Sequence, residues 1–518
     1  MIKPNIIDKA IGIFSPKAAI RRLQERQALA LIGGYNGASL RRPALQNWNP
    51  SAGDATSDTI TDLPTLRARS RDLARNAPIG GSAINTVVSN VIGTGLSMQS
   101  NPDAKVLGWD DEKVAEWKKL VESEWKLWSE NVRCDATETL NFYGLQGLAL
   151  RSMLESGDVI AITPTVAGRS PYQLTIQLIE ADRLCNANNA IDSETKIAGI
   201  TIDDKGKAIS YDIAKRHPGA YRGVAGQQWT TIQAFGENGR KNVIHLFQRK
   251  RPGQLRGVPY LAPVVEHLKQ LSRYSEAELQ AAVVSAAFAV FLKMDADAFS
   301  GIFDDDSRQR YIDRVGKWDG KVDVDAPGNV INMMPGEDVT VPNLGRPNAN
   351  FDPFFLAMLK QIGPALEIPF EVLVKHFSSS YSASRAALLD FWRTVRVVRD
   401  FMATYFCEPI KQLWFEEAVA LGRIPAPGFF ADERLRQAYT RVSWIGDGPG
   451  SIDPEKEINA AIKRMQYNVS TLEKEAAAYD GGDWETNITQ RSKEKKLMDD
   501  LGLNDQEDTE TSTLPPQS

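Results

Sequence analysis

The sequence has few cysteines and no long apolar run. Only Cys134, Cys185 and Cys407 occur among 518 residues, and no two of them are close in sequence. This usage is typical of a reducing compartment and argues against a disulfide scaffold or a thiolate zinc site. The most apolar run, residues 281–292, is too short to span a bilayer. The N-terminus has Lys9 inside its apolar run, which is not typical of a signal peptide. We therefore expect a cytoplasmic setting without membrane contact.

An excess of positive charge is also absent. Acidic residues outnumber Lys and Arg by 66 to 61, which gives a formal net charge of −5 and a pI of about 5.7. A protein whose main task is to bind nucleic acid tightly needs clustered Lys and Arg, so the balance argues against that class. With 42% apolar and 25% charged residues, the chain is typical of a globular protein with room for two or three domains.

The common catalytic signatures are missing. No GxxxxGK[ST] phosphate loop and no HExxH zinc motif occurs, and the four His residues are far apart in sequence. Residues 193–196 match SxxK, but the partner motifs SDN and KTG are absent. Residues 304–306 are three consecutive Asp, yet the Gly and Glu that an EF-hand loop requires do not follow. We therefore expect a solvated acidic turn at 304–306, no metal, no cofactor and no enzymatic activity.

The stretch KHFSSSYSASRAALL at 375–389 combines Lys, His and Ser, the residue types of a nucleophilic site. No acid lies nearby to orient His376, and no GxSxG elbow is present. No Gly allows the close backbone approach of a phosphate cradle. The stretch is more typical of a mobile polar contact loop. Two enzyme alternatives remain open: a serine hydrolase at 376–382 and a metal-dependent nuclease at 304–306.

Both ends of the chain carry charge of one sign. Residues 1–50 hold eight Lys or Arg against two acids, and residues 499–518 hold six acids and no base. Both segments are expected to be weakly ordered, either as solvated termini or as partner-binding segments.

The first half of the chain is expected to be helical and then strand-rich. Residues 66–96 predict two short helices that are broken at Pro78 and Gly80-Gly81, a pattern that leaves a sequence-specific DNA-binding protein using 66–92 as an alternative. An apolar stripe on the next helix, at 110–130, predicts core packing. The stripe consists of Val114, Trp117, Val121, Trp125 and Trp128. From about 158 to 250, alternating β-branched residues predict several strands.

The second half predicts long helices around a small insert. Residues 260–294 and about 352–374 read as helices, the latter interrupted at Gly363-Pro364 and ended by Ile368-Pro369. The acidic segment 295–350 between them predicts a short helix around 306–318 and strands at GNVINMM and EDVTVPN. A helix over 384–406 would carry four Arg on one face and Phe391, Val395, Val398, Met402 and Phe406 on the other. Asp453-Pro454 and a capping box at Ser470–Glu473 predict two further helix starts.

The ordered series of segments resembles the lambda family of bacteriophage portal proteins. The segments are RARSRDLARNAPIGGSAINTVVSNVIGTGL, LIEADRL, HLFQRKRPGQLRGVPYLAPV, MMPGEDV, IGPALEIPFEVL, SSSYSASRAALL, WIGDGPGSIDPEKEINA and STLEKEAA. The likeness covers most of the chain. Small departures are Lys375-His376 before the Ser-rich loop and Gly363-Pro364 in the preceding helix.

The resemblance implies an α+β portal fold assembled as a dodecameric ring at one capsid vertex. Its parts would be a basic N-terminal arm (1–60), a wing (61–258), a first stem helix (259–294), a clip (295–350), a second stem helix (351–374), a tunnel loop (375–390), a long helix returning to the wing (391–445), a helical crown (446–490) and an acidic disordered tail (491–518). Double-stranded DNA would be packaged and ejected through the ring. Other implied partners are the terminase large subunit, a major capsid or scaffold protein and a head-completion or tail connector protein. The protein would reside in the virion, and in the host cytoplasm during assembly.

The resemblance also implies roles for named residues. The tunnel-loop contacts to DNA would be Lys375, His376, Ser378, Ser379, Ser380, Tyr381 and Ser382. The Arg face would be Arg385, Arg393, Arg396 and Arg399, either at the subunit interface, which we favour because Arg pairs well with acids there, or facing DNA. The candidates in the clip for docking the terminase are Asp304, Asp305, Asp306, Arg308, Arg310 and Arg314.

Overall fold

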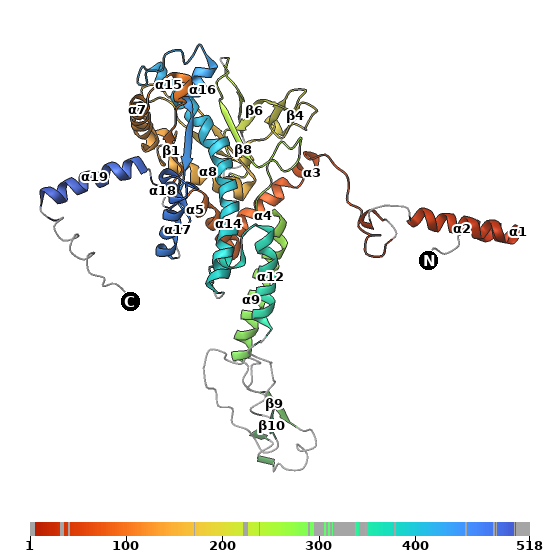
Figure 1. Ribbon diagram of the computed structural model, residues 1–518. Coiled ribbons are helices and arrows are strands. Elements are labelled where there is room, and N and C mark those ends of the chain that lie inside the picture. The colour runs from red at the N-terminus through yellow and green to blue at the C-terminus, as the bar shows by residue number, and fades with distance from the viewer. Residues whose placement is uncertain are drawn as a thin grey trace, which may run out of the picture. The chain divides into compact units, whose positions relative to one another are not determined.

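The computed structural model divides the chain into two units, Met1–Ser57 and Asp58–Ser518, which are described separately. It describes residues 6–31, 36–39, 42–169, 171–220, 226–237, 239–287, 291–294, 305–306, 309–310, 313, 337–340, 348, 350–377, 380–450, 453–479, 482, 484–501 and 503. Helices and antiparallel sheets both contribute, so the fold is α+β as expected (Figure 1). Within these residues no helix is long and apolar enough to cross a bilayer.

The N-terminal unit contains two packed helices, α1 (Ile6–Phe14) and α2 (Pro16–Leu31), and a 3-10 turn, η1 (Asn36–Ala38). The expectation of weak order is therefore wrong for 6–31. Ala, Leu, Gln, Lys and Arg fill α2 and all favour a helix, and Pro16 at its first position has no N–H to leave unpaired. An ion pair between Arg22 and Asp8 (3.3 Å) joins the two helices.

The second unit begins with α3 (Ser57–Ile60), α4 (Leu63–Asn76) and α5 (Pro78–Val91). The predicted break falls at Ala77-Pro78, while Gly80 and Gly81 lie inside α5. A Cβ on Gly80 would come within 2.8 Å of the Leu73 carbonyl oxygen, so this glycine lets the two helices approach closely. Six residues of α5 are buried. A recognition helix must be exposed to enter a DNA groove, so the burial of α5 counts against the helix-turn-helix alternative.

The main core forms around tryptophans. Strand β1 (Ser97–Ser100) and α6 (Ala104–Leu107) lead to α7 (Asp111–Ser129), η2 (Val132–Cys134) and α8 (Phe142–Ser156). The Asp110 carboxylate caps α7 by accepting a hydrogen bond from the Lys113 N–H (2.9 Å). Trp125 is fully buried and makes edge contacts with Phe142 and Trp414. Trp117, Val121, Trp125 and Trp128 of the predicted stripe are confirmed as core, whereas Val114 is half-buried outside it.

Two antiparallel sheets occupy the predicted strand region. One has the order β3-β2-β8 and the other the order β4-β5-β6-β7. Their bounds are β2 (Asp158–Ile162), β3 (Gln177–Glu180), β4 (Lys196–Ile197), β5 (Ile200–Ile202), β6 (Ala208–Ala214), β7 (Trp229–Gln233) and β8 (Val243–Phe247), with 3-10 turns η3 (Ala181–Arg183) and η4 (Ala187–Asn189). A second, smaller core lies among these strands and includes Ile160, Ile200 and Ile213.

A buried charged cluster joins the helical part to the sheets. The Asp158 side chain is fully buried and accepts hydrogen bonds from Arg67 (2.7 Å) and Arg256 (2.6 Å). His245 Nε2 lies 3.2 Å from the same carboxylate. Burial alone would raise the pKa of Asp158, but Arg256 and Arg67 hold it well below its usual range. Burial lowers the pKa of His245, although Asp158 opposes this. The cluster thus fixes α4, β2, β8 and the loop at 256 in one arrangement.

Two helices flank the insert, as expected. A 3-10 turn, η5 (Ala262–Val264), leads into α9 (Val265–Ala287), which packs beside α12 (Phe351–Ala365) through Tyr274, Phe351 and Phe354. The predicted interruption at Gly363-Pro364 is wrong, because both residues lie inside α12. The helix ends at Ala365, close to the predicted end at Ile368-Pro369, and after a tight turn α13 (Phe370–Val374) follows. A Cβ on Gly363 would come within 2.7 Å of the Ile368 carbonyl oxygen, so glycine permits this tight turn.

The predicted helix 260–294 is too long. It ends at Ala287, and β9 (Phe291–Met294) pairs antiparallel with β10 (Glu337–Thr340). Phe291 and Leu292 suit a strand once a partner is available, and that partner is distant in sequence. The strand predicted at EDVTVPN is confirmed over 337–340. GNVINMM, and most of the helix predicted at 306–318, lie outside the described residues.

The remaining elements return to the helical core. The long α14 (Tyr381–Met402) continues through a π turn, η6 (Ala403–Cys407), into α15 (Glu408–Ala420) and α16 (Glu433–Thr440). Strand β11 (Val442–Ile445) then pairs with β1. Phe391, Val395, Met402 and Phe406 are buried as predicted, and Val398 is half-buried.

Three helices follow β11: α17 (Pro454–Gln466), α18 (Leu472–Tyr479) and α19 (Trp484–Asp500). Asp453 caps α17 as predicted, by accepting from the Lys456 N–H. The capping box at Ser470 is wrong by one residue, because the Thr471 hydroxyl accepts from the Lys474 N–H. Disorder beginning at 491 is also wrong, since α19 runs to Asp500. Its Arg491, Lys493, Lys495 and Lys496 balance the acids and favour a helix.

Candidate functional site

The polar loop predicted at 375–390 is much shorter in the structure. Lys375 ends α13 in the left-handed conformation (φ 54°), and α14 begins at Tyr381. Ser380 caps α14, since its hydroxyl accepts from the Ala383 N–H (3.4 Å). The correction has a local cause: this serine cap, followed by Ala and Arg, starts the helix before the Leu-rich part. The loop is therefore Lys375–Ser380.

The predicted loop contacts fall into three groups. Lys375, His376 and Ser380 are exposed on the loop, and Tyr381 and Ser382 are exposed on the first turn of α14. Ser378 and Ser379 lie outside the described residues. No ion pair or acceptor among the described residues orients His376, so the arrangement shows no nucleophilic triad.

The first turns of α14 contact α17. Arg385 Nη1 donates hydrogen bonds to the Tyr381 hydroxyl (3.1 Å) and to Glu457 Oε1 (3.3 Å). The hydrogen bond that Arg385 donates to the Tyr381 hydroxyl raises the pKa of Arg385. Lys456 Nζ lies 5.9 Å from the centre of the Tyr381 ring and pairs with Asp453 (2.7 Å). The N-terminal end of α14, which adjoins the loop, is therefore linked to the start of α17, so a movement of one would change the contacts of the other.

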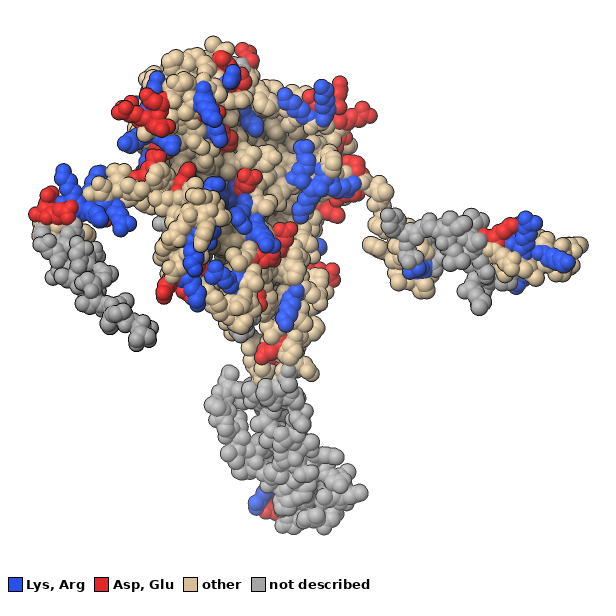
Figure 2. All heavy atoms as spheres, viewed as in Figure 1, with Lys and Arg blue, Asp and Glu red and all other residues tan. Residues whose placement is uncertain are grey.

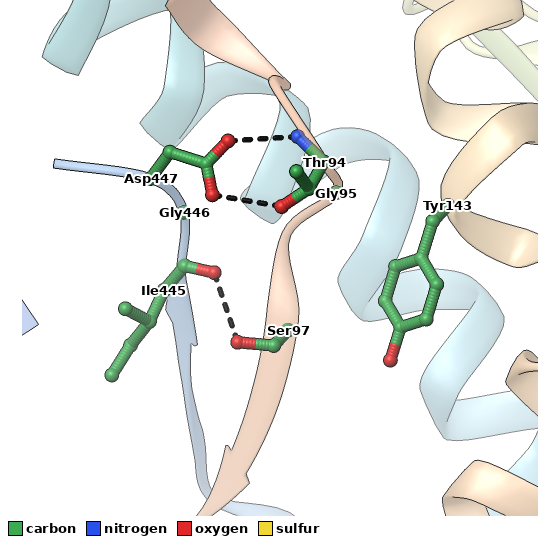
Figure 3. Close-up of a pocket in the computed structure, with 7 residues that line it drawn as sticks. All are labelled: Thr94, Gly95, Ser97, Tyr143, Ile445, Gly446 and Asp447. Atoms are coloured by element: carbon green, nitrogen blue, oxygen red, sulfur yellow. Dashed lines mark hydrogen bonds between the residues drawn. The ribbon is translucent and has the colours of Figure 1, made fainter. Parts of the chain in front are cut away.

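Near the other end of α14, two glycine-rich segments meet although they are some 350 residues apart in sequence. Asp447 accepts hydrogen bonds from the Thr94 N–H and hydroxyl (both 2.8 Å), and the Ser97 hydroxyl donates to the Ile445 carbonyl (Figure 3). They surround a cavity of about 280 Å³ that Tyr143 also lines. Gly93 has φ 57°, and a Cβ there would come within 2.0 Å of Asp447 Oδ2. Glycine is therefore required for this contact.

Arg399 holds α14 in the same junction. Its Nε donates to the Val91 carbonyl (3.0 Å), and its Nη2 donates to the carbonyls of Asn90 (2.9 Å) and Asp447 (3.0 Å). The guanidinium also lies 5.3 Å from the centre of the Trp392 ring. Asn90 and Val91 end α5, so Arg399 supplies a cation where the helix dipole is negative. The residue thus ties α14, the end of α5 and the segment after β11 together.

Comparison with known proteins decides the family. A model of the family described as phage portal protein, lambda family, matches residues 41–399. The chain belongs to the lambda family of phage portal proteins. Portal protein B of Escherichia phage lambda is 26% identical over 488 residues, which cover 91% of each chain. The portal protein of Escherichia phage N15 is 26% identical over 490 residues, covering 91% of this chain and 90% of its own.

Solved structures give a weaker likeness. A chain in the virion of a native gene transfer agent particle has a TM-score of 0.44 and 13% identity, and the match covers 79% of this chain and 90% of that one. A chain in the neck of such a particle, computed with C12 symmetry, has a TM-score of 0.41 and 12% identity, with 80% and 98% covered. The family match and the two phage relatives, not these structures, confirm the resemblance seen in the sequence.

The four Arg predicted on one face of α14 do not share one environment. In this portal protein Arg385 and Arg399 bind groups of their own chain. Arg393 is exposed and lies 3.9 Å from Asp390 three residues before it, and Arg396 donates to the Trp392 carbonyl (3.4 Å) while remaining exposed. Helical spacing alone could not separate them, because the difference comes from what packs against each turn.

The docking candidates in the insert are only partly placed. Asp305, Asp306 and Arg310 are exposed, and Arg310 pairs with Asp306 (2.5 Å) at helical spacing. Asp304, Arg308 and Arg314 lie outside the described residues. Among the residues that are described, no three His, Cys, Asp or Glu side chains gather as a metal site would require.

Replacing Arg399 with alanine should loosen the junction. Three backbone carbonyls lose their donor, and we expect a cost of about 2–3 kcal/mol in the free energy of unfolding. Amide exchange at Thr94 should accelerate, since Asp447 would no longer be held. Arg396→Ala, a change at an exposed position three residues earlier, should cost less than about 0.5 kcal/mol. Urea unfolding and hydrogen exchange measure both effects, and equal costs for the two variants would contradict the assignment.

Proposed function

We propose that this portal protein assembles as a ring of twelve subunits at one capsid vertex, and that double-stranded DNA enters and leaves the particle through the ring. Membership in the portal family over residues 41–399 carries the proposal. The structure supports it with a long helix, α14, that is packed in the core on one face and carries the exposed loop at its start.

We propose that seven residues contact the DNA: Lys375, His376, Ser378, Ser379, Ser380, Tyr381 and Ser382. Lys375 is the only residue among these seven that carries a full positive charge at neutral pH. Each phosphate that a protein neutralises releases counterions and adds affinity, so several fixed cations per subunit would hold the duplex in place. Small hydroxylated side chains can guide a duplex and still let it slide. The net charge of −5 is consistent with a low affinity for DNA.

The exposed Arg393 and Arg396 are assigned to contacts with a neighbouring subunit. Their guanidinium groups point away from the buried face of α14 and suit bidentate pairing with carboxylates.

The insert 295–350, which is flanked by the packed helices α9 and α12, is assigned to docking of the terminase large subunit and later of a head-completion or tail connector protein. The wing is assigned to contact with the capsid or scaffold protein. Assembly would take place in the host cytoplasm, and no catalytic step is assigned to the chain.

Electron microscopy of the purified protein tests the proposal. We expect rings with a central hole wide enough for a duplex, and class averages that give the subunit number. Mass photometry of the same sample checks the mass of the ring against that of one 57.3 kDa chain. A monomer at every concentration tested would contradict ring assembly, and rings of another subunit number would contradict the dodecamer alone.

A further inference from the structure

A small pocket lies in the strand-rich region, away from the loop and the junction described above. It has a volume of about 210 Å³ and lies among β5, β6, β8 and the segment that follows β7. Tyr211, Phe235 and Phe247 line it with aromatic rings. Small-molecule sites usually have about 300–1,000 Å³, so this pocket is better suited to one or two side chains of a peptide.

The charged residues that line the pocket are all basic. They are Lys207, Lys241 and Arg249. Lys207 Nζ lies 4.8 Å from the centre of the Phe235 ring, and the Arg249 guanidinium lies 5.8 Å from that of Phe247. None of the three cations forms an ion pair with a carboxylate in the part of the chain that the structure describes. Burial lowers the pKa of Lys241, and a nearby anion would oppose that effect.

A buried cluster with an excess of positive charge adjoins the pocket, although the Asp203 carboxylate accepts from the Lys207 N–H at its edge (2.8 Å). His245, which also lines the pocket, contacts the buried cluster in which one carboxylate, Asp158, faces two guanidinium groups. Figure 2 shows Lys and Arg side chains interspersed with Asp and Glu on the strand-rich side of the second unit, so the positive charge is confined to the pocket and its immediate border. A protein with a net negative charge thus keeps a local site for an anion with an apolar anchor.

We propose that this pocket binds the acidic C-terminal segment of the protein itself, residues 501–510, with Leu503 in the aromatic pocket and the following acids on its basic rim. Leu503 is 66% exposed directly after α19, and the sequence then continues NDQEDTE. In an extended peptide Leu503, Asp505 and Glu507 lie on one face, because side chains alternate. One apolar anchor followed by two carboxylates matches one aromatic pocket bordered by cations.

The inference does not depend on the portal function, and a peptide-binding experiment tests it on the full chain. The acceptor is full-length protein whose own segment is disabled by Leu503→Ser, Asp505→Asn and Glu507→Gln. A fluorescein-labelled peptide of residues 499–518 is titrated with this acceptor, and binding is followed by fluorescence anisotropy. We expect saturable binding that weakens as salt is added, since charge pairs contribute to it.

Matched charge reversals distinguish binding in the pocket from nonspecific electrostatic attraction to the protein surface. Lys207→Glu with Arg249→Glu in the acceptor should weaken binding at least tenfold. Lys205→Glu with Lys250→Glu changes the net charge equally at exposed neighbouring positions that do not line the pocket, and should weaken it less than threefold. A peptide with Lys at 505 and 507 should regain affinity for the Lys207→Glu, Arg249→Glu acceptor.

Three results would overturn the proposal. These are no binding of the wild-type peptide, equal losses in the two charge-reversal acceptors, and displacement of the peptide by a 20-base-pair duplex at a lower concentration than by unlabelled peptide. The last result would make the pocket a nucleic-acid site. Circular dichroism of each acceptor confirms that the surface substitutions leave the fold intact.

Discussion

Replacing Asp158 with asparagine should destabilise the second unit by about 3–5 kcal/mol, which is the cost of breaking a buried ion pair by removing one partner. The side chain is fully buried, and Arg67 and Arg256 are 5% and 2% exposed. Asparagine has nearly the same shape, so the loss would come from charge and not from packing. Two guanidinium groups would remain buried without a carboxylate.

The expected loss is large because of how the two Arg are held. Arg256 also donates to the carbonyls of Leu184 (2.8 Å) and Ala181 (2.7 Å), and Arg67 donates to that of Ser156 (2.8 Å). These bonds keep the guanidinium groups in place when Asp158 is neutralised, so neither can swing into water. A whole domain is stable by only about 5–15 kcal/mol, so the variant should lose a large part of its stability.

Urea unfolding followed by tryptophan fluorescence measures the effect. Asp182→Asn is the matched control, because Asp182 pairs with Arg71 in a partly exposed position and should cost about 1 kcal/mol or less. If Asp158→Asn cost no more than Asp182→Asn, the cluster would not be the element that joins α4 to the sheets.

The elements that could be predicted from the sequence are those whose signals are local. The apolar stripe of α7 and the alternating strands at 158–250 follow from periodicities of 3.6 and 2 residues within one element. The cap at Asp453 depends on a side chain and an N–H three residues apart. The series of short motifs pointed to the portal family because their order, unlike any one of them, is specific.

The features that could not be predicted depend on partners distant in sequence. Phe291–Met294 reads as the end of a helix until its partner strand at 337–340 is known. Asp447 shows no role in its own segment, since its hydrogen bonds go to Thr94. Both segments belong to motifs that carry the family resemblance. Their glycines, in IGTG and IGDGPG, each indicate a close backbone approach but do not indicate that the two segments approach each other. Arg399 and Arg393 likewise lie on the same helix, and their environments differ only because α5 and the segment after β11 pack against Arg399.

Deleting Ser378 and Ser379 should leave the ring intact and lower the titre of the phage at least 100-fold. The deletion removes two of the six residues between α13 and α14, and shortens the reach of the loop by up to about 7 Å. Ring assembly should persist because the core contacts of α13 and α14, made by Val372, Leu373, Phe391 and Val395, are untouched. If the loop is what contacts the passing duplex, a shortened loop can no longer guide or retain it.

A length-preserving variant distinguishes the effect of loop length from the effect of the serine hydroxyl groups. Ser378→Ala with Ser379→Ala keeps the loop length and the Ser380 cap, so α14 should start at the same residue. We expect this variant to package and retain DNA within about fivefold of wild type, because shape and reach matter more than any one hydroxyl. A nucleophilic serine at 378 or 379 would instead make the alanine variant as defective as the deletion.

Complementation of a phage that lacks its portal gene gives both readouts: titre, and nuclease-protected DNA per particle. Electron microscopy of the purified deletion variant shows whether rings form. Rings together with empty heads would place the defect in DNA passage or retention. DNA-filled heads at the wild-type level would remove the loop from that role, and would leave the exposed Lys375 and the first turn of α14 without an assigned partner.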